Sequence, residues 1–221
     1  MATISEVCEF IRSGANERLT LALKENPGLA EEKTEQGISI LTYACYCRNA
    51  DAVALIKEKK RSLDIFECAC TGDLPALRRH LNNTPASLDA FSPDGFTLLG
   101  YSCFFGHAAL ARFLAEQGAN LNLASNNTFK VAPLHSACAI SDLATTEMLL
   151  KHGANPNMQQ QAGYTPLHEA AQNGQQQLAQ LLIDHGADVN ALTDDKRSPY
   201  ALAKEKGHVE TAALIRKHGG K

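Results

Sequence analysis

The sequence predicts an all-α fold, a solenoid of stacked antiparallel helix pairs joined by short β-hairpin fingers. The first observation is a repeated unit, because one apolar or aromatic position recurs along almost the whole chain, at Val7, Leu41, Ile65, Leu99, Leu134, Leu167 and Tyr200. The second observation is the fixed order of helix-start and helix-stop residues inside each unit. A period of roughly 33 residues is typical of stacked units that cannot bury their apolar faces alone.

The copy around Leu167 shows how one unit is expected to fold. Thr165 can cap a helix that begins at Pro166, where the missing amide proton costs little. Gly174 ends this first helix, because the left-handed conformation needed there is easiest for glycine. The second helix buries one apolar stripe, formed by Leu178, Leu181 and Leu182. Residues 187–191 are short and turn-rich, and we expect them to form a finger.

Seven approximate copies together form one expected domain over residues 1–221. Their boundaries are 1–36, 37–62, 63–94, 95–129, 130–162, 163–195 and 196–221. The interval from Leu41 to Ile65 is too short to contain a finger, so we expect the finger between copies two and three to be missing. In copies one and three the apolar stripe starts one residue later after Gly14 and Gly72, which predicts a longer turn between their helices.

Composition narrows the functional classes. The 221 residues carry a net charge of −3 and cluster basic residues only at 57–61, which argues against the basic stripe of a nucleic-acid surface. No segment has the apolar length to span a bilayer, and the first residues lack the features of a secretion signal. We therefore expect a cytoplasmic monomer that contacts neither nucleic acid nor membrane. Seven cysteines, an odd number, fit a reducing compartment better than a disulfide framework.

Four cysteines suggest a metal or redox site but have a simpler interpretation. Cys45 and Cys47 lie two residues apart on one first helix, as do Cys68 and Cys70 on another, and side chains at that spacing point apart. Neither pair can therefore chelate one ion, and we interpret these thiols as packing residues. A link between Cys47 and Cys70, or a zinc role, stays open as a minor alternative.

Two histidines occupy equivalent positions near the start of a first helix. His135 and His168 are expected to hydrogen-bond locally and to tie neighbouring loops together, rather than to act in catalysis. The sequence offers no nucleophile beside an oriented base and no glycine-rich phosphate loop. We therefore predict no catalytic residues, no cofactor, no metal and no enzyme activity.

Residues 165–191 contain Thr-Pro-Leu-His-Glu-Ala-Ala, then Gly174, then Gly-Ala-Asp-Val-Asn-Ala. This order resembles the signature of the ankyrin repeat family. The resemblance is specific over residues 95–221 and weaker over residues 1–94, which keep the helix pattern without the Thr-Pro-Leu-His box. It implies the solenoid described above and a function in protein binding.

The resemblance also implies which positions contact a partner in a concave groove. They are the two residues before the glycine that ends the first helix, and the residue after the glycine that opens the cap. The partner-binding candidates are Tyr46, Phe96, Phe104, Phe105, Val131, Ile140, Tyr164, Gln172, Asn173 and Arg197. The central candidates are apolar or aromatic, and a contiguous apolar patch usually marks an interaction site. The competing interpretation is that Phe104 and Phe105 fill the space to the neighbouring helices.

We predict a non-enzymatic scaffold that binds a partner protein through the groove of copies three to six. One alternative is a dedicated regulatory subunit or inhibitor, whose groove would cover the active site of an enzyme encoded with it. A second alternative, a metal- or redox-responsive protein, depends on Cys47 and Cys70.

Overall fold

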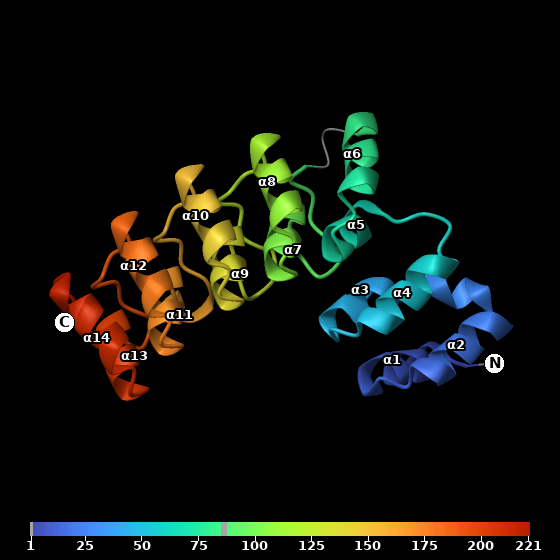
Figure 1. Cartoon of the computed structure of the whole chain (residues 1–221), viewed down its shortest axis with the longest axis horizontal. Helices are drawn as coiled ribbons and strands as arrows, with labels where there is room; N and C mark the ends of the chain where they lie inside the picture. Colours follow the sequence, from blue (N-terminus) through green and yellow to red (C-terminus); the bar gives the residue numbers. More distant parts are fainter. Residues whose placement is uncertain (1, 85–87) are drawn as a thin grey trace. The chain divides into compact units, whose positions relative to one another are not determined.

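The computed structural model describes residues 2–84 and 88–221, and it confirms the all-α repeat fold (Figure 1). Each predicted copy contains one helix pair. The pairs are α1 (Ile4–Ser13) with α2 (Asn16–Glu25), α3 (Ile40–Tyr46) with α4 (Ala50–Lys59), α5 (Ile65–Thr71) with α6 (Leu74–Asn83), α7 (Leu98–Phe104) with α8 (Ala108–Glu116), α9 (Pro133–Ala139) with α10 (Leu143–Lys151), α11 (Pro166–Gln172) with α12 (Gln176–Asp184), and α13 (Pro199–Glu205) with α14 (Val209–Lys217). Short 3₁₀ turns are present at η1 (Pro27–Glu31) and η3 (Gln161–Gly163).

The chain divides into two compact units. Unit 1 comprises the described parts of residues 1–87 together with residues 92–94, and therefore contains α1 to α6. Unit 2 comprises residues 88–91 and 95–221, and contains α7 to α14. The expectation of one cooperative domain over the whole chain stays a prediction.

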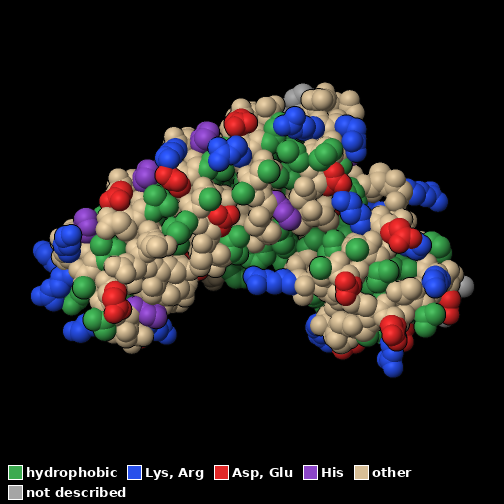
Figure 2. Space-filling model, in the orientation of Figure 1, with side chains coloured by type: hydrophobic (Ala, Val, Ile, Leu, Met, Phe, Trp, Pro, Cys, Tyr) green, Lys and Arg blue, Asp and Glu red, His purple; other side chains and the backbone are tan. Residues whose placement is uncertain are grey.

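Charged side chains of both signs are mixed over the visible surface. Figure 2 shows Lys and Arg interspersed with acidic and hydrophobic side chains over each unit. This face therefore carries no continuous basic stripe of the kind that a nucleic-acid backbone requires.

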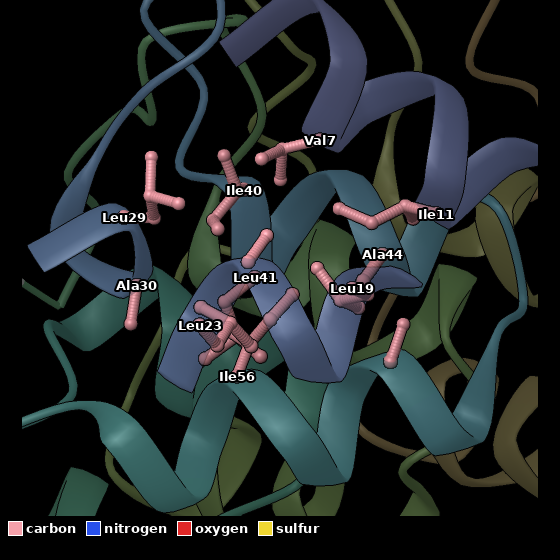
Figure 3. Packing of buried hydrophobic residues seen from close by; sticks show 12 residues of the cluster. Val7, Ile11, Leu19, Leu23, Leu29, Ala30, Ile40, Leu41, Ala44 and Ile56 are labelled. Carbon is pink, nitrogen blue, oxygen red and sulfur yellow. The ribbon is translucent and has the colours of Figure 1, made fainter. Parts of the chain in front are cut away.

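The core of unit 1 lies between the helices of the first two copies. Side chains from α1, α2, η1, α3 and α4 converge there, as Figure 3 shows. Its most buried members include Val7, Ile11, Leu19, Leu23, Ile40, Leu41 and Ile56. Because aliphatic side chains of this size each contribute about 1.5–3 kcal/mol when fully buried, this cluster holds the degenerate copies together.

The finger between copies two and three is missing, which confirms the expectation from the sequence. Residues 60–64 alone connect α4 to α5. In place of a finger, the buried ammonium group of Lys60 lies 2.9 Å from Glu31 Oε2 and 2.9 Å from Glu67 Oε1. Lys60 also donates a hydrogen bond to the Ala30 carbonyl over 3.3 Å. One side chain thus joins the end of η1 to α5.

The prediction of a longer turn in copies one and three is wrong. Helices α2 and α6 begin two residues after Gly14 and Gly72, and α12 begins at the same spacing after Gly174. Leu19 and Leu77 instead occupy the position that the buried residues Ala111 and Ala179 hold in other copies. The turn is unchanged, and the second helix buries a different set of side chains.

Unit 2 is a regular stack. The first helices of the pairs, α7, α9, α11 and α13, pack against one another in order. The second helices, α8, α10, α12 and α14, form a parallel row beside them (Figure 1). The segments between successive helix pairs are hydrogen-bonded turns. The β-hairpin fingers expected from the sequence are therefore not formed in the described part of these segments. Phe91 and Thr97 form an isolated antiparallel bridge. Backbone bonds join neighbouring fingers, namely Asn126 N to Gly95 O (2.9 Å), Gln161 N to Phe129 O (2.9 Å) and Asp194 N to Ala162 O (3.0 Å).

A second set of bonds crosses the fingers through side chains. One carboxylate and three amide oxygens each accept a hydrogen bond from a backbone N–H of the next copy. These bonds run from Asn120 N to Asp89, from Asn155 N to Asn122, from Asp188 N to Asn157, and from Lys221 N to Asn190, over 2.7–3.1 Å. We call these four acceptors the side-chain ladder. They fix the spacing between copies, because each acceptor satisfies an amide that would otherwise lack a partner within its own turn.

Replacing Gly163 with alanine is expected to destabilise unit 2 by about 2–3 kcal/mol. Gly163 has a φ of 74°, where an L side chain costs about 1–2 kcal/mol. An added Cβ would also lie 2.8 Å from Asp194 Oδ1 and 3.0 Å from Asp194 N, so the neighbouring finger would have to move. The change can be measured by urea unfolding followed by circular dichroism.

The matched control for this experiment is Gly186→Ala. Gly186 has a φ of 87°, but no atom of the described residues lies within 4 Å of an added Cβ. This variant should show only the conformational cost of about 1–2 kcal/mol. Equal losses in the two variants would contradict the role of the Gly163 contact between fingers.

Candidate functional site

Half-buried aromatic side chains gather at the start of unit 2. Phe96, on the finger before α7, stacks on Tyr101 with ring centroids 5.7 Å apart. Tyr101 is buried and meets Phe105 edge-on at 5.5 Å, and Phe105 meets Phe104 edge-on at 5.2 Å. Phe96, Phe104 and Phe105 are each half-buried, so they pack against their neighbours and still present part of each ring to solvent. Such pairs contribute about 0.5–1.5 kcal/mol beyond the area that they bury.

The next copies continue this surface with smaller apolar and then polar side chains. Ile140 follows α9 and lies close to Gly106, since its Cδ1 is 3.5 Å from the position of a Cβ on that glycine. Asn173 follows α11 and is exposed. We call the surface formed by the fingers and the open sides of α7, α9, α11 and α13 the inner face of unit 2.

A hydrogen-bonded network ends the inner face. Arg197 Nη2 donates to Tyr164 Oη over 2.9 Å, and Tyr164 Oη donates to Gln172 Oε1 over 3.4 Å. The guanidinium group also pairs with Asp195 at 2.7 Å and with Glu205 at 3.5 Å. Three predicted partner-binding residues from two adjacent copies are therefore joined in one network, which limits the freedom of their side chains before any partner arrives.

A cleft of about 300 Å³ opens between two fingers and α11. It includes three of the predicted residues, Val131, Tyr164 and Gln172. Its other lining residues were not predicted from the sequence; they are Phe129, Gln160, Gln161, Ala162 and Glu169. A signal existed for the first of them, because the interval from Leu99 to Leu134 is longer than the interval from Leu134 to Leu167. The additional residues lie in the finger that carries Phe129.

A family model described as ankyrin repeats (3 copies) matches residues 65–160 and 134–221 of this chain. The chain belongs to the ankyrin repeat family. Both units take part in the match, because α5 and α6 of unit 1 lie within the matched residues.

Three curated proteins are similar to parts of this ankyrin-repeat chain. Ankyrin repeat and SOCS box protein 16 of Mus musculus is 42% identical over 59 residues, which cover 27% of this chain and 13% of that protein. Rabankyrin-5 of Homo sapiens is 40% identical over 73 residues, or 32% of this chain and 6% of that protein. E3 ubiquitin-protein ligase Ufd4 of Drosophila melanogaster is 28% identical over 101 residues, or 46% of this chain and 4% of that protein. The chain thus spans a small part of each relative.

Ankyrin repeats are protein–protein interaction modules, and the family is generally non-enzymatic. The two histidines have the structural role that the sequence predicts for this repeat. His168 Nδ1 accepts a hydrogen bond from Thr165 N over 3.1 Å, while Nε2 lies 3.1 Å from the Arg197 carbonyl in the next finger. His135 makes the equivalent contacts with Ala132 N at 3.3 Å and with the Tyr164 carbonyl at 3.4 Å.

Cys45, Cys68 and Cys70 are buried in ankyrin helices of unit 1. A hydrogen bond with Cys45 and burial raise the pKa of the Cys70 thiol. Cys47 instead lies at the end of α3, half-buried, and shares a hydrogen bond with Tyr43. The thiol next to Cys70 is therefore that of Cys45. The link considered from the sequence named Cys47 as the partner of Cys70 instead. Within residues 2–84 and 88–221, no three His, Cys, Asp or Glu side chains gather closely enough to hold a metal ion.

One predicted contact residue lies outside unit 2. Tyr46 ends α3 in unit 1, is half-buried and donates a hydrogen bond to Asp94 Oδ2 over 2.6 Å.

None of the ankyrin helices that the structure describes is long and apolar enough to cross a membrane.

Proposed function

We propose that this chain is a non-enzymatic ankyrin-repeat module that binds a partner protein through the concave groove of its central repeats. The observation that carries this proposal is the inner face of unit 2, where half-buried aromatic and apolar side chains from adjacent copies lie beside an open cleft. The proposed contact residues in unit 2 are Phe96, Phe104, Phe105, Val131, Ile140, Tyr164, Gln172, Asn173 and Arg197. We propose Tyr46 as a separate contact carried by unit 1.

The energetics of such a surface support binding. A standard-size interface buries about 800 Å² on each partner, and a few aromatic or arginine anchors supply most of its binding energy. Phe104, Phe105 and Arg197 are side chains of these types. Because the fingers are bonded to one another and Arg197 is already held by Tyr164, little further ordering is needed on association.

Changing Phe104 and Phe105 together to serine is expected to weaken partner capture by at least about tenfold, since aromatic anchors often contribute more than 1–2 kcal/mol each. The measurement is affinity capture from the lysate of the source cells by the immobilised full chain, with quantitative mass spectrometry. Helical circular dichroism and the melting temperature of the variant must be recorded in parallel, because the two rings also contact each other and Tyr101.

A matched variant changes two exposed apolar residues that begin second helices, Leu143 and Val209, to serine. This outer pair should retain every partner that the unchanged chain captures specifically. Proteins lost equally from both variants are non-specific. If the Phe104, Phe105 double variant keeps its partners but loses stability, the two rings only fill space in the core and the proposed binding surface is wrong.

A further inference from the structure

The cleft on the inner face of unit 2 has fixed walls. Phe129 and Val131 lie on one finger, residues 160–164 form the next finger, and Glu169 and Gln172 face it from α11. The two fingers are joined by the bond from Gln161 N to Phe129 O, over 2.9 Å. The second finger is closed on itself by the bond from Gln160 N to Tyr164 O, over 2.8 Å. The cleft has a volume of about 300 Å³, at the lower end of the range for ligand sites, and this volume suits one or two side chains.

The half-buried carboxylate of Glu169 lines this cleft and has only a weak polar partner. Burial raises the pKa of Glu169, and the amide of Gln160 only partly opposes this effect. The Gln160 amide approaches Glu169 Oε2 at 3.5 Å, the long limit of a hydrogen bond. In the part of the chain that the structure describes, no Lys, Arg or His forms an ion pair with Glu169. A half-buried carboxylate without a cation keeps part of its desolvation cost.

Aromatic rings flank the same cleft. Phe129 is 56% exposed, which is high for a phenylalanine, and Tyr164 forms the neighbouring wall. The hydroxyl of Tyr164 is held by Arg197 and Gln172, so the orientation of the phenol ring is fixed. A ring face attracts an ammonium or guanidinium group by about 0.5–2 kcal/mol, and it also packs against an aliphatic stem.

We propose that this cleft binds a lysine or arginine side chain of the partner protein, with its cationic group at Glu169 and its aliphatic stem against Phe129 and Tyr164. The inference rests on the proposed function, and it names the chemistry of the partner segment. A cation satisfies the carboxylate, and the aromatic walls accept the carbons that precede it. An acidic or purely aliphatic side chain would cover Glu169 further without supplying a cation.

The test uses a phage library of random twelve-residue peptides, panned on the immobilised full chain. Selected peptides are synthesised with the basic residue unchanged, with lysine replaced by norleucine, or with arginine replaced by citrulline. Their affinities are measured by isothermal titration calorimetry. The protein variants are Glu169→Gln, which removes the charge and keeps the size, and the matched control Glu210→Gln on the exposed side of α14.

We expect the selected peptides to share a lysine or arginine. Loss of its charge, or Glu169→Gln, should weaken binding by about tenfold or more, and the two changes together should weaken it little further. Glu210→Gln should leave the affinity unchanged. Glu169→Gln should melt at the same temperature as the unchanged chain or higher, because the change removes a charge that has no cationic partner. A lower melting temperature would indicate that Glu169 has a structural role instead.

Two other results are distinguishable. In the first, the peptides need Phe104 and Phe105 for binding, but their affinity does not depend on a basic residue or does not change in Glu169→Gln. This result overturns the inference and leaves the proposed function standing. A library that yields no peptide dependent on either the aromatic pair or the cleft counts against both.

Discussion

Replacing Lys60 with methionine is expected to destabilise unit 1 by about 3–5 kcal/mol, the usual cost of leaving a buried charge without its partner. The side chains of Lys60 and Glu67 are only 5% and 3% exposed, and their charged atoms lie 2.9 Å apart. Burial by itself would lower the pKa of Lys60, but the bonds to Glu31 and Glu67 outweigh it and raise the pKa, so the ammonium group is charged. Glu67 Oε1 depends on this charge, because it has no well-aligned hydrogen bond among the described residues.

Urea unfolding measures the total loss, and amide hydrogen exchange in α3 and α5, compared with exchange in α9 and α11, shows whether the loss is confined to unit 1. The control is Lys59→Met, which breaks only the exposed pair with Glu58 and should cost less than about 1 kcal/mol. The double variant Lys60→Met, Glu67→Gln should recover part of the stability. If Lys60→Met is no worse than Lys59→Met, the ion pair does not replace the missing finger as a connection.

Acid is expected to destabilise unit 2 through His135 by about 3 kcal/mol, mostly between pH 6.5 and pH 4. Burial lowers the pKa of His135 to about 4, whereas the unfolded chain should titrate near 6.5. Between these values the unfolded state binds more protons than the folded state, so stability is complete above the window and falls as the pH falls through it. The Nδ1 atom accepts from Ala132 N, and a proton there would oppose that donor.

The measurement compares unfolding free energies of the unchanged chain and of His135→Gln from pH 7.5 to pH 4. The variant should be less stable at neutral pH but should lose less stability on acidification. His218→Gln, at an exposed position after α14, should follow the unchanged chain at every pH. Burial also lowers the pKa of His168, which acts in the same direction and should persist in the His135 variant. Parallel curves for the unchanged chain and His135→Gln would contradict the assignment.

Local signals in the sequence predict the helix pairs of this protein. The helix that begins at Pro166 ends before Gly174, and Leu178 and Leu182 of the next helix are buried as their spacing requires. Caps, glycines and apolar stripes act within a few residues of one another, so their effect is readable without knowing the neighbours. The helix pairs follow from such signals, whereas the missing finger follows from the short interval between Leu41 and Ile65.

The cleft could be predicted only in part, because it depends on contacts between copies. Glu169 lies in a helix where a solvent-facing glutamate would be ordinary, and it is half-buried because two fingers lie beside it. The exposure of Phe129 depends on the path of an irregular finger. The stripe Leu19, Ala22 and Leu23 of α2 is buried as its spacing indicates, but the length of the turn before it was mispredicted, because Leu19 occupies a position that alanine holds in other copies.

The side-chain ladder has a consequence for how such a chain can change in length. Asn122, Asn157 and Asn190 each reach an amide one complete copy further along. Duplication or loss of a whole copy leaves every acceptor opposite a donor, because the new neighbour presents the same amide. Removal of a few residues from one copy would instead leave an amide unsatisfied at the joint. Growth and shortening of unit 2 are therefore tolerated in steps of one helix pair with its finger.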